Sequence, residues 1–215
     1  MTKKATKGPC ALCGKDYARA GMTRHLESCL KKGSGATGHP GKSQRFFLVL
    51  VTGRYATDYW MHLKVAAGTT LESLDDFLRD TWLECCGHMS AFMRRREEIG
   101  MNRKVDRIFT PGLELEHIYD FGSSTELRVK VVNAFMGPVT PRKPVEMLAR
   151  NEAPMIPCDA CGRMPAATIC KECQWEGEGW LCSSCAETHE CFVDGEASCL
   201  PVVNSPRTGT CAYTG

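Results

Sequence analysis

The sequence predicts an α+β fold, with a mostly antiparallel sheet, a helix on one face of it, and two small zinc-binding modules. Three observations support this prediction. Apolar residues alternate with polar ones in several stretches between residues 44 and 136, as in half-buried strands. One amphipathic helical repeat lies among these stretches. Most of the 14 cysteines lie near the two ends of the chain, and four pairs are spaced C-x-x-C.

The first strands of the α+β domain are predicted from two neighbouring stretches. Residues 46–51 form a continuous apolar run of strand length, and residues 59–66 alternate between two faces. A T-x-x-E capping box from Thr69 to Glu72 then opens a helix over 70–83. Further strands are predicted over 89–93, 113–119 and 127–131. The order β-β-α-β-β-β is typical of an antiparallel sheet with one covering helix.

The segments on either side divide the chain by composition. We place a C2HC zinc finger over 1–32, a flexible Gly/Ser-rich linker over 33–43, the α+β domain over 44–136, a proline-rich linker over 137–157 and a two-zinc module over 158–215. A short helix-like run over 145–150 lies inside the second linker.

The cysteines are better explained by metal than by disulfides. No apolar run reaches the length of a membrane span, and the start of the chain lacks the apolar stretch of a signal peptide. We therefore expect a cytoplasmic protein without a membrane partner. Disulfides are rare in that reducing compartment, so clustered cysteines favour zinc.

The first zinc site is predicted near the start of the chain. Cys10 and Cys13 form a knuckle, and His25 and Cys29 follow one helical turn apart. The spacing resembles a ββα zinc finger that is one residue shorter in the middle and ends in Cys. Tyr17 and Met22 stand at the positions of that finger's core hydrophobic residues. So small a segment has too little core to fold alone, so the metal would supply the folding energy.

Two more sites are predicted in the cysteine-rich tail. Three knuckles and a closing His/Cys pair supply eight ligands. In a cross-braced arrangement one ion is held by Cys158, Cys161, Cys182 and Cys185, and the other by Cys170, Cys173, His189 and Cys191. A ribbon-like pairing of the first two knuckles is the alternative, and Cys199 could replace Cys191. Fully protein-ligated sites are structural, so we expect about three structural zinc ions and no catalytic residue.

Charge is distributed unevenly along the chain. Residues 1–45 carry ten Lys/Arg against two Asp/Glu, whereas residues 151–215 carry three against nine. The basic head favours contact with DNA, RNA or a ribonucleoprotein, and the acidic tail favours a protein partner. The candidate phosphate contacts are Arg19, Arg24, Lys31 and Lys32 in the head and Arg94, Arg95 and Arg96 in the domain.

Three stretches of the domain together carry a family resemblance. They are Leu71-Glu72-Ser73-Leu74-Asp75-Asp76-Phe77-Leu78, Trp82-Leu83-Glu84-Cys85-Cys86-Gly87-His88-Met89-Ser90-Ala91-Phe92 and Tyr119-Asp120-Phe121-Gly122-Ser123-Ser124-Thr125-Glu126-Leu127. Residues 44–136 resemble the plasmid pRiA4b ORF-3-like family, also called IS1096 passenger TnpR-like. The resemblance implies an α+β domain without a settled activity. The run Leu200–Arg207 resembles the ending of zinc-bearing members of this group.

These observations favour a non-enzymatic zinc-binding adaptor that contacts nucleic acid or a ribonucleoprotein through its basic head. One alternative is a protein–protein interaction module with purely structural zinc. Another is an enzyme that uses Cys85, Cys86 and His88, together with His117 and Asp120; the same cluster could also bind a metal. Buried cysteines under a helix end are the simpler interpretation of the cluster, since free Cys is often buried.

Overall fold

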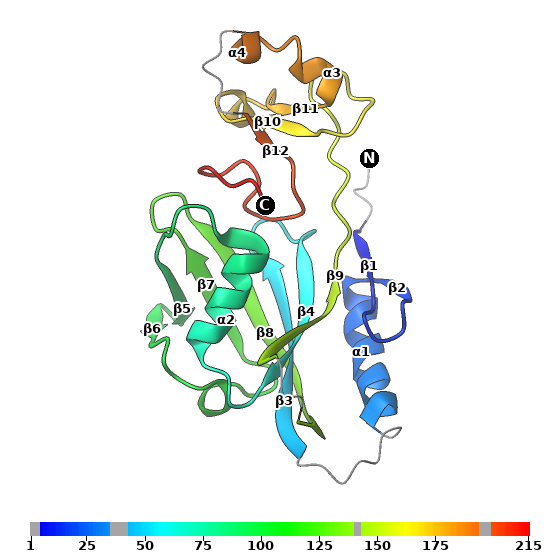
Figure 1. The fold of residues 1–215 in the computed structure, drawn as a ribbon, viewed down its shortest axis with the longest axis vertical. Coiled ribbons are helices and arrows are strands. Elements are labelled where there is room, and N and C mark those ends of the chain that lie inside the picture. Colours follow the sequence, from blue (N-terminus) through cyan, green and yellow to red (C-terminus); the bar gives the residue numbers. More distant parts are fainter. Residues whose placement is uncertain (1–4, 35–42, 140–142, 194–198) are drawn as a thin grey trace. The chain divides into compact units, whose positions relative to one another are not determined.

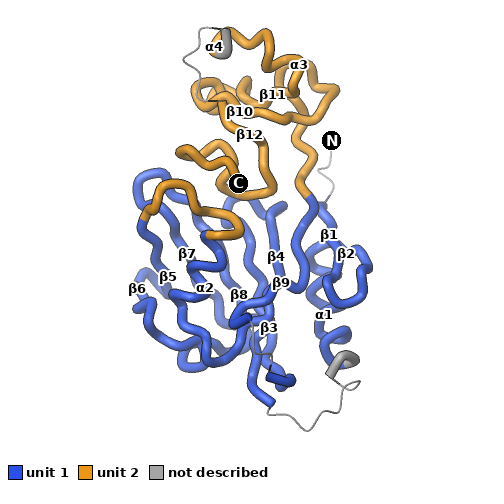
Figure 2. Tube along the Cα trace, in the orientation of Figure 1, with its two compact units in different colours: residues 1–79, 89–152 blue, residues 80–88, 153–215 orange. Residues whose placement is uncertain are grey.

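The computed structural model describes residues 5–34, 43–139, 143–193 and 199–215 (Figure 1). The chain divides into two compact units (Figure 2). Unit 1 comprises residues 1–79 and 89–152, and unit 2 comprises residues 80–88 and 153–215. Within the described ranges, no helix combines the length and apolar character that crossing a bilayer requires.

An antiparallel sheet forms the centre of unit 1. The described residues give it seven strands in the order β6-β5-β7-β8-β3-β4-β9. Their bounds are Ser43–Gly53 (β3), Trp60–Ala66 (β4), Ser90–Arg94 (β5), Glu97–Ile99 (β6), Glu114–Tyr119 (β7), Thr125–Pro138 (β8) and Val145–Arg150 (β9). The predicted α+β class is confirmed.

Helix α2 (Leu71–Leu78) covers one face of this sheet. Its N-cap is Thr70, whose Oγ1 accepts a hydrogen bond from the Ser73 backbone N–H at 3.2 Å. The cap therefore lies one residue later than the predicted capping box. The helical segment continues to Leu83 as a π-helical turn, η1 (Arg79–Leu83), most of which belongs to unit 2.

Helix α1 (Arg19–Ser34) covers the opposite face. His117 of β7 contacts Asp75 of α2, and strand pairing puts Val49 and Val51 of β3 on that same face. The residues that alternate with them point the other way, and Leu48 packs in one buried cluster with α1. Because both faces are covered, β3 reads in the sequence as a continuous apolar run.

The segment 145–150 differs from its prediction. The sequence predicts a helix-like run within a linker, but these residues form β9 at the sheet edge beside β4. The register shifts between His62 and Leu63, where Leu148 is the extra residue of a bulge. Leu148 and Ala149 are therefore both buried, and this spacing imitates a helical period.

Two further differences concern the predicted linker before β3 and a strand after β5. The flexible linker predicted over 33–43 lies largely outside the described residues, since α1 continues to Ser34 and β3 begins at Ser43. The strand β6, which the sequence does not predict, forms a hairpin with β5.

Unit 2 is the smaller of the two, and fewer of its described apolar residues are buried than in unit 1. Its described strands form a three-stranded antiparallel sheet in the order β11-β10-β12. The elements are β10 (Thr168–Cys170), η3 (Cys173–Trp175), β11 (Trp180–Leu181), α3 (Ser183–Ala186), α4 (Glu190–Val193) and β12 (Cys199–Pro201). One buried cluster consists of Cys158, Leu181, Cys182 and Ala186, so half of its members are thiols.

Candidate metal centres

The first Cys/His group lies in the segment predicted as a zinc finger. Strands β1 (Lys7–Pro9) and β2 (Asp16–Ala18) pair, and α1 follows directly, which gives a ββα unit. The ligand atoms of Cys10, Cys13, His25 and Cys29 all lie within 4.8 Å of one another. Cys13 Sγ and His25 Nε2 are 3.2 Å apart. This arrangement could hold one metal ion.

The backbone of the knuckle between β1 and β2 favours the thiolate form of Cys13. Gly14 has a left-handed backbone with φ of 72°, which lets the chain turn back after Cys13. The backbone N–H of Lys15 donates to the Cys13 sulfur and lowers the pKa of that thiol. His25 stacks on Tyr17, with ring centroids 4.3 Å apart. Tyr17 thus supports the site from within the ββα unit, and Met22 packs in one buried cluster with Cys10.

The ββα unit is packed into unit 1. Its Met22 and Leu26 are fully buried in one cluster with Leu48, Trp60 and Leu148 of the sheet. Backbone hydrogen bonds join the two parts as well: the Ala11 N–H donates to the Leu148 carbonyl and the Glu152 N–H donates to the Lys7 carbonyl, both at 2.7 Å. The finger therefore extends the core of the sheet domain.

Two further groups lie in unit 2. One contains Cys158, Cys161, Cys182 and Cys185, and the other contains Cys170, Cys173, His189 and Cys191. These are the two sets of the cross-braced arrangement; the ribbon-like pairing does not occur. Cys191 joins the second set, with its sulfur 3.6 Å from that of Cys173, whereas Cys199, whose thiol forms a hydrogen bond with Cys170, is not a member of any group among the described residues.

Backbone amides also favour thiolates in unit 2. The backbone N–H of Arg163 lowers the pKa of the Cys161 thiol to about 6. Burial raises the pKa of the Cys170 thiol, but the backbone N–H of Cys173 and the ring of His189 outweigh it, and the pKa falls to about 7. Metals bind the thiolate form, so these two thiols need less free energy for deprotonation on binding. Hydrogen bonds with neighbouring sulfurs act the other way on Cys173 and Cys185 and raise the pKa of each thiol to about 12.

The sequence analysis identifies only three of the four residues of a further Cys/His group. Cys85, Cys86 and His88 are joined by Cys211 from the tail, and their ligand atoms also lie within 4.8 Å of one another. All four residues belong to unit 2. The hydrogen bond with His88 lowers the pKa of the Cys211 thiol to about 6. Counting ligands narrows the fourth partner of Cys85, Cys86 and His88 to Cys199 or Cys211, the two tail cysteines left over, and the structure selects Cys211.

Comparisons with known proteins add the following. No family model and no curated protein matches the chain. A solved protein of unknown function from Methanosarcina mazei Go1, MM3350, is similar at 16% sequence identity with a TM-score of 0.42, over 55% of this chain and 75% of that one. The resemblance to the pRiA4b ORF-3-like family therefore stays a prediction.

The other two sequence candidates for an active site have structural partners. His117 is fully buried, and its Nε2 lies 2.6 Å from Asp75 Oδ1, while Ser90 Oγ donates to the other carboxylate oxygen at 2.7 Å. Asp120 Oδ1 accepts the backbone N–H groups of Gly122 and Ser123 and so holds a turn. Burial makes the His117 network a core feature of unit 1.

The basic candidates fall into two sets. On α1, Arg24 and Lys31 are exposed, whereas Arg19 donates to the Thr57 carbonyl at 3.0 Å. The side chain of Lys32 lies outside the described residues. Arg94, Arg95 and Arg96 are exposed at the β5–β6 hairpin.

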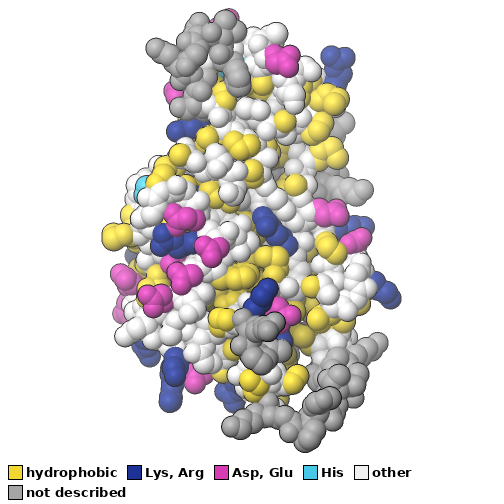
Figure 3. All heavy atoms as spheres, viewed as in Figure 1, with side chains coloured by type: hydrophobic (Ala, Val, Ile, Leu, Met, Phe, Trp, Pro, Cys, Tyr) yellow, Lys and Arg dark blue, Asp and Glu magenta, His cyan; other side chains and the backbone are white. Residues whose placement is uncertain are grey.

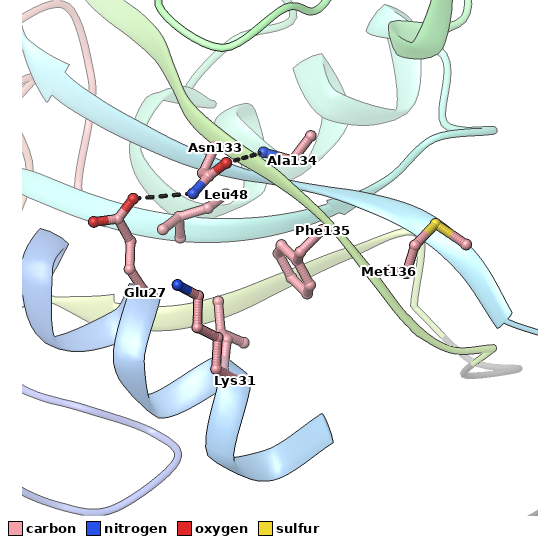
Figure 4. Close-up of a pocket in the computed structure, with 8 residues that line it drawn as sticks. Glu27, Lys31, Leu48, Asn133, Ala134, Phe135 and Met136 are labelled. Carbon is pink, nitrogen blue, oxygen red and sulfur yellow. Dashed lines mark hydrogen bonds between the residues drawn. The ribbon is translucent and has the colours of Figure 1, made fainter. Parts of the chain in front are cut away.

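Beside α1 lies an apolar groove of about 280 Å³, entirely within unit 1 (Figure 4). Glu27 and Lys31 of α1 line one wall, and β8 forms the other. The Asn133 side chain donates to Glu27 at 3.0 Å across the groove. Phe135 and the half-exposed Met136 supply its apolar surface.

Proposed function

We propose that this protein is a non-enzymatic adaptor, organised by zinc, that contacts the phosphate backbone of nucleic acid. Its Cys/His groups are compatible with zinc binding. Each group has four protein ligands, and a fully ligated zinc ion has no open position for substrate or water. The ions, about three of them by the predicted sites, would then serve structure. Contacts with nucleic acid would then be made by side chains on the protein surface.

The observation that carries this proposal is the tip of the β5–β6 hairpin. Arg94 pairs with Glu97, so Arg95 and Arg96 form a two-residue loop. Both have left-handed backbones, with φ of 51° and 70°. Such loops favour Asn-Gly, and two arginines there cost conformational energy. Strained residues that persist at an exposed tip are typical of functional positions.

Neighbouring residues extend this basic surface. Arg94, Arg103 and Arg107 line a polar depression of about 220 Å³ beside the hairpin, together with Glu97 and Glu98. In the described part of the chain, no ion pair engages Arg94, Arg95 or Arg96. Guanidinium groups without a protein anion are suited to phosphate oxygens.

The opposite charge marks another part of unit 1. Acidic side chains gather over α2 (Figure 3), and Glu72 and Asp76 of this helix are exposed. This surface would repel phosphate. Exposed Arg24 and Lys31 on α1 could add contacts, as the basic head predicts.

The test removes the positive charge of the turn with residues that favour the same turn, so that a change in binding is not caused by a loss of stability. Replacing Arg95 with Asn and Arg96 with Gly removes two charges and fits the turn, so stability should hold or rise. Affinity for labelled RNA and DNA, measured by fluorescence polarisation between 50 and 200 mM salt, should fall at least about tenfold, and the salt slope should decrease by about 2.

The matched control removes two charges elsewhere. Arg128→Gln with Lys130→Gln changes two exposed residues of β8, and affinity should change less than about twofold. If the wild-type protein shows no salt-sensitive binding to any RNA or DNA tested, the proposal is wrong.

A second candidate function is a protein–protein adaptor, which the apolar groove beside α1 favours. Met136 is 56% exposed there, and apolar surface of this kind is typical of protein contacts. The acidic tail could serve a protein partner in the same way. Partner binding that survives Arg95→Asn with Arg96→Gly, in a protein without affinity for nucleic acid, would favour this candidate.

A further inference from the structure

We propose that Cys85, Cys86, His88 and Cys211 bind a fourth zinc ion, which fixes the end of the chain to the segment 85–88. This site goes beyond the three that the sequence predicts, and it does not depend on nucleic-acid binding. It also replaces the thiol-enzyme interpretation of the same residues.

The spacing of the ligand atoms supports a tetrahedral ion. Cys211 Sγ lies 3.5 Å from Cys86 Sγ and 3.5 Å from His88 Nε2. Ligands at zinc bond lengths of about 2.0 to 2.3 Å stand about 3.5 to 3.8 Å apart in a tetrahedron. A disulfide would need sulfurs about 2.05 Å apart. The same spacing occurs in the group predicted from the tail, where Cys173 and Cys191 sulfurs are 3.6 Å apart.

Backbone geometry lets these residues converge. Gly87, with φ of 74°, turns the chain between Cys86 and His88, and its N–H donates to the Glu84 side chain at 2.7 Å. Cys211 has a left-handed backbone with φ of 53°, which is uncommon for a residue other than glycine. A bond from its sulfur to a metal would compensate for that conformation.

A buried arginine provides the matching charge. Arg207 is fully buried, and its Nη2 donates to Cys85 Sγ at 3.3 Å. A nearby anion stabilises a buried cation. Zinc with three thiolates and one histidine carries one net negative charge, so Arg207 would both neutralise the centre and orient Cys85.

Hydrogen bonds bring the two segments together around this centre. Ser205 Oγ donates to the Trp82 carbonyl at 2.6 Å, and the Arg207 N–H donates back to Ser205 Oγ at 2.9 Å. The tail is thus held next to the segment that carries Cys85 by contacts of Ser205 and Arg207. Four protein ligands close the site, which makes it structural.

Elemental analysis of the full chain, purified without chelator, tests this proposal. We expect about four zinc ions per wild-type chain and about three in Cys211→Ser. The control Cys199→Ser removes a cysteine that contacts Cys170 but is not a member of any group among the described residues, and it should keep about four. The proposal fails if wild type and Cys211→Ser both hold three zinc ions, or if the fourth metal is iron.

A second measurement works on the wild-type protein and does not require the variant to fold. Cys86 is exposed, so a free thiol there would react quickly with N-ethylmaleimide. In the zinc-loaded protein we expect Cys85, Cys86 and Cys211 to resist labelling, as located by peptide mass spectrometry, and to become reactive together when a chelator is added. Rapid labelling of Cys86 in the loaded protein, or a Cys86–Cys211 disulfide in the native protein, would overturn the fourth site.

Discussion

At the scale of the residue, burial decides what a histidine can do. The sequence places His62 on a strand, where it is more often a packing or surface residue than a ligand. It is fully buried under α1, and its Nε2 lies 2.7 Å from Thr23 Oγ1. Burial, with a smaller contribution from the charge of Arg19, lowers the pKa of His62 from 6.5 to about 4. His62 is thus neutral in the folded protein at pH 7, and the unfolding free energy therefore depends on pH in the acidic range.

We therefore predict a specific loss of stability below pH 6.5. The unfolded chain protonates His62 near pH 6.5, whereas the folded protein does so only near pH 4, so acid favours unfolding between these values. Between pH 7 and pH 5 the unfolding free energy should fall by about 2 kcal/mol more in the wild type than in His62→Gln. Urea denaturation at both pH values, with zinc in equal excess, measures this difference. Equal losses in the two proteins would show that His62 titrates normally.

At the scale of the element, close backbone contact joins the ββα unit to the sheet. Cys10 forms a bridge with Ala149, and Trp60 Nε1 donates to Thr6 Oγ1 at 3.0 Å. A Cβ atom on Gly8 would lie 1.8 Å from the Arg150 carbonyl oxygen. Only glycine allows β1 to approach β9 this closely.

The change Gly8→Ala should therefore separate β1 from the sheet edge. We expect a loss of about 2 kcal/mol or more in unfolding free energy, because the clash is with backbone that has no alternative position. Urea denaturation measures the loss, and limited proteolysis should show faster cleavage near residues 1–32. Gly68→Ala is the control, since a Cβ there meets nothing within 4 Å. Equal stability of the two variants would mean that the finger is not docked in solution.

At the scale of the whole molecule, the two units differ in what stabilises them. Unit 1 has a sheet with both faces covered by helices, and its core contains many large side chains. Unit 2 includes a small buried cluster in which two of the four residues are candidate zinc ligands. We infer that unit 2 depends on metal for its folding.

Loss of one ligand in unit 2 should thus have a local and large effect. In Cys182→Ser we expect zinc content to fall by at least about one ion per chain and residues 153–193 to become sensitive to protease, while unit 1 stays resistant. Cys199→Ser, which changes a cysteine outside the groups, should match the wild type. Mass spectrometry of the proteolytic fragments and elemental analysis check both expectations. A protease-resistant Cys182→Ser protein with full zinc content would contradict the dependence on metal.

Local spacing predicted much of this protein. The C-x-x-C knuckles and the His/Cys pairs predict three groups that the structure brings together, because their members are close in sequence or repeat evenly. The strands β4, β7 and β8 are predicted from an apolar period of two, and β3 from a continuous apolar run, because these patterns follow from burial of one or both faces of a sheet. The helix α2 follows from its cap and its apolar spacing.

Only the tertiary structure decided the rest, because it depends on contacts between distant residues. The bulge at Leu148 gives β9 a helix-like spacing of apolar residues, and β4, the strand that pairs with β9, is distant in the sequence. The docking of the finger depends on the missing Cβ of Gly8 beside Arg150. Cys211 joins Cys86 across 125 positions of the chain, a separation at which no local period constrains the sequence.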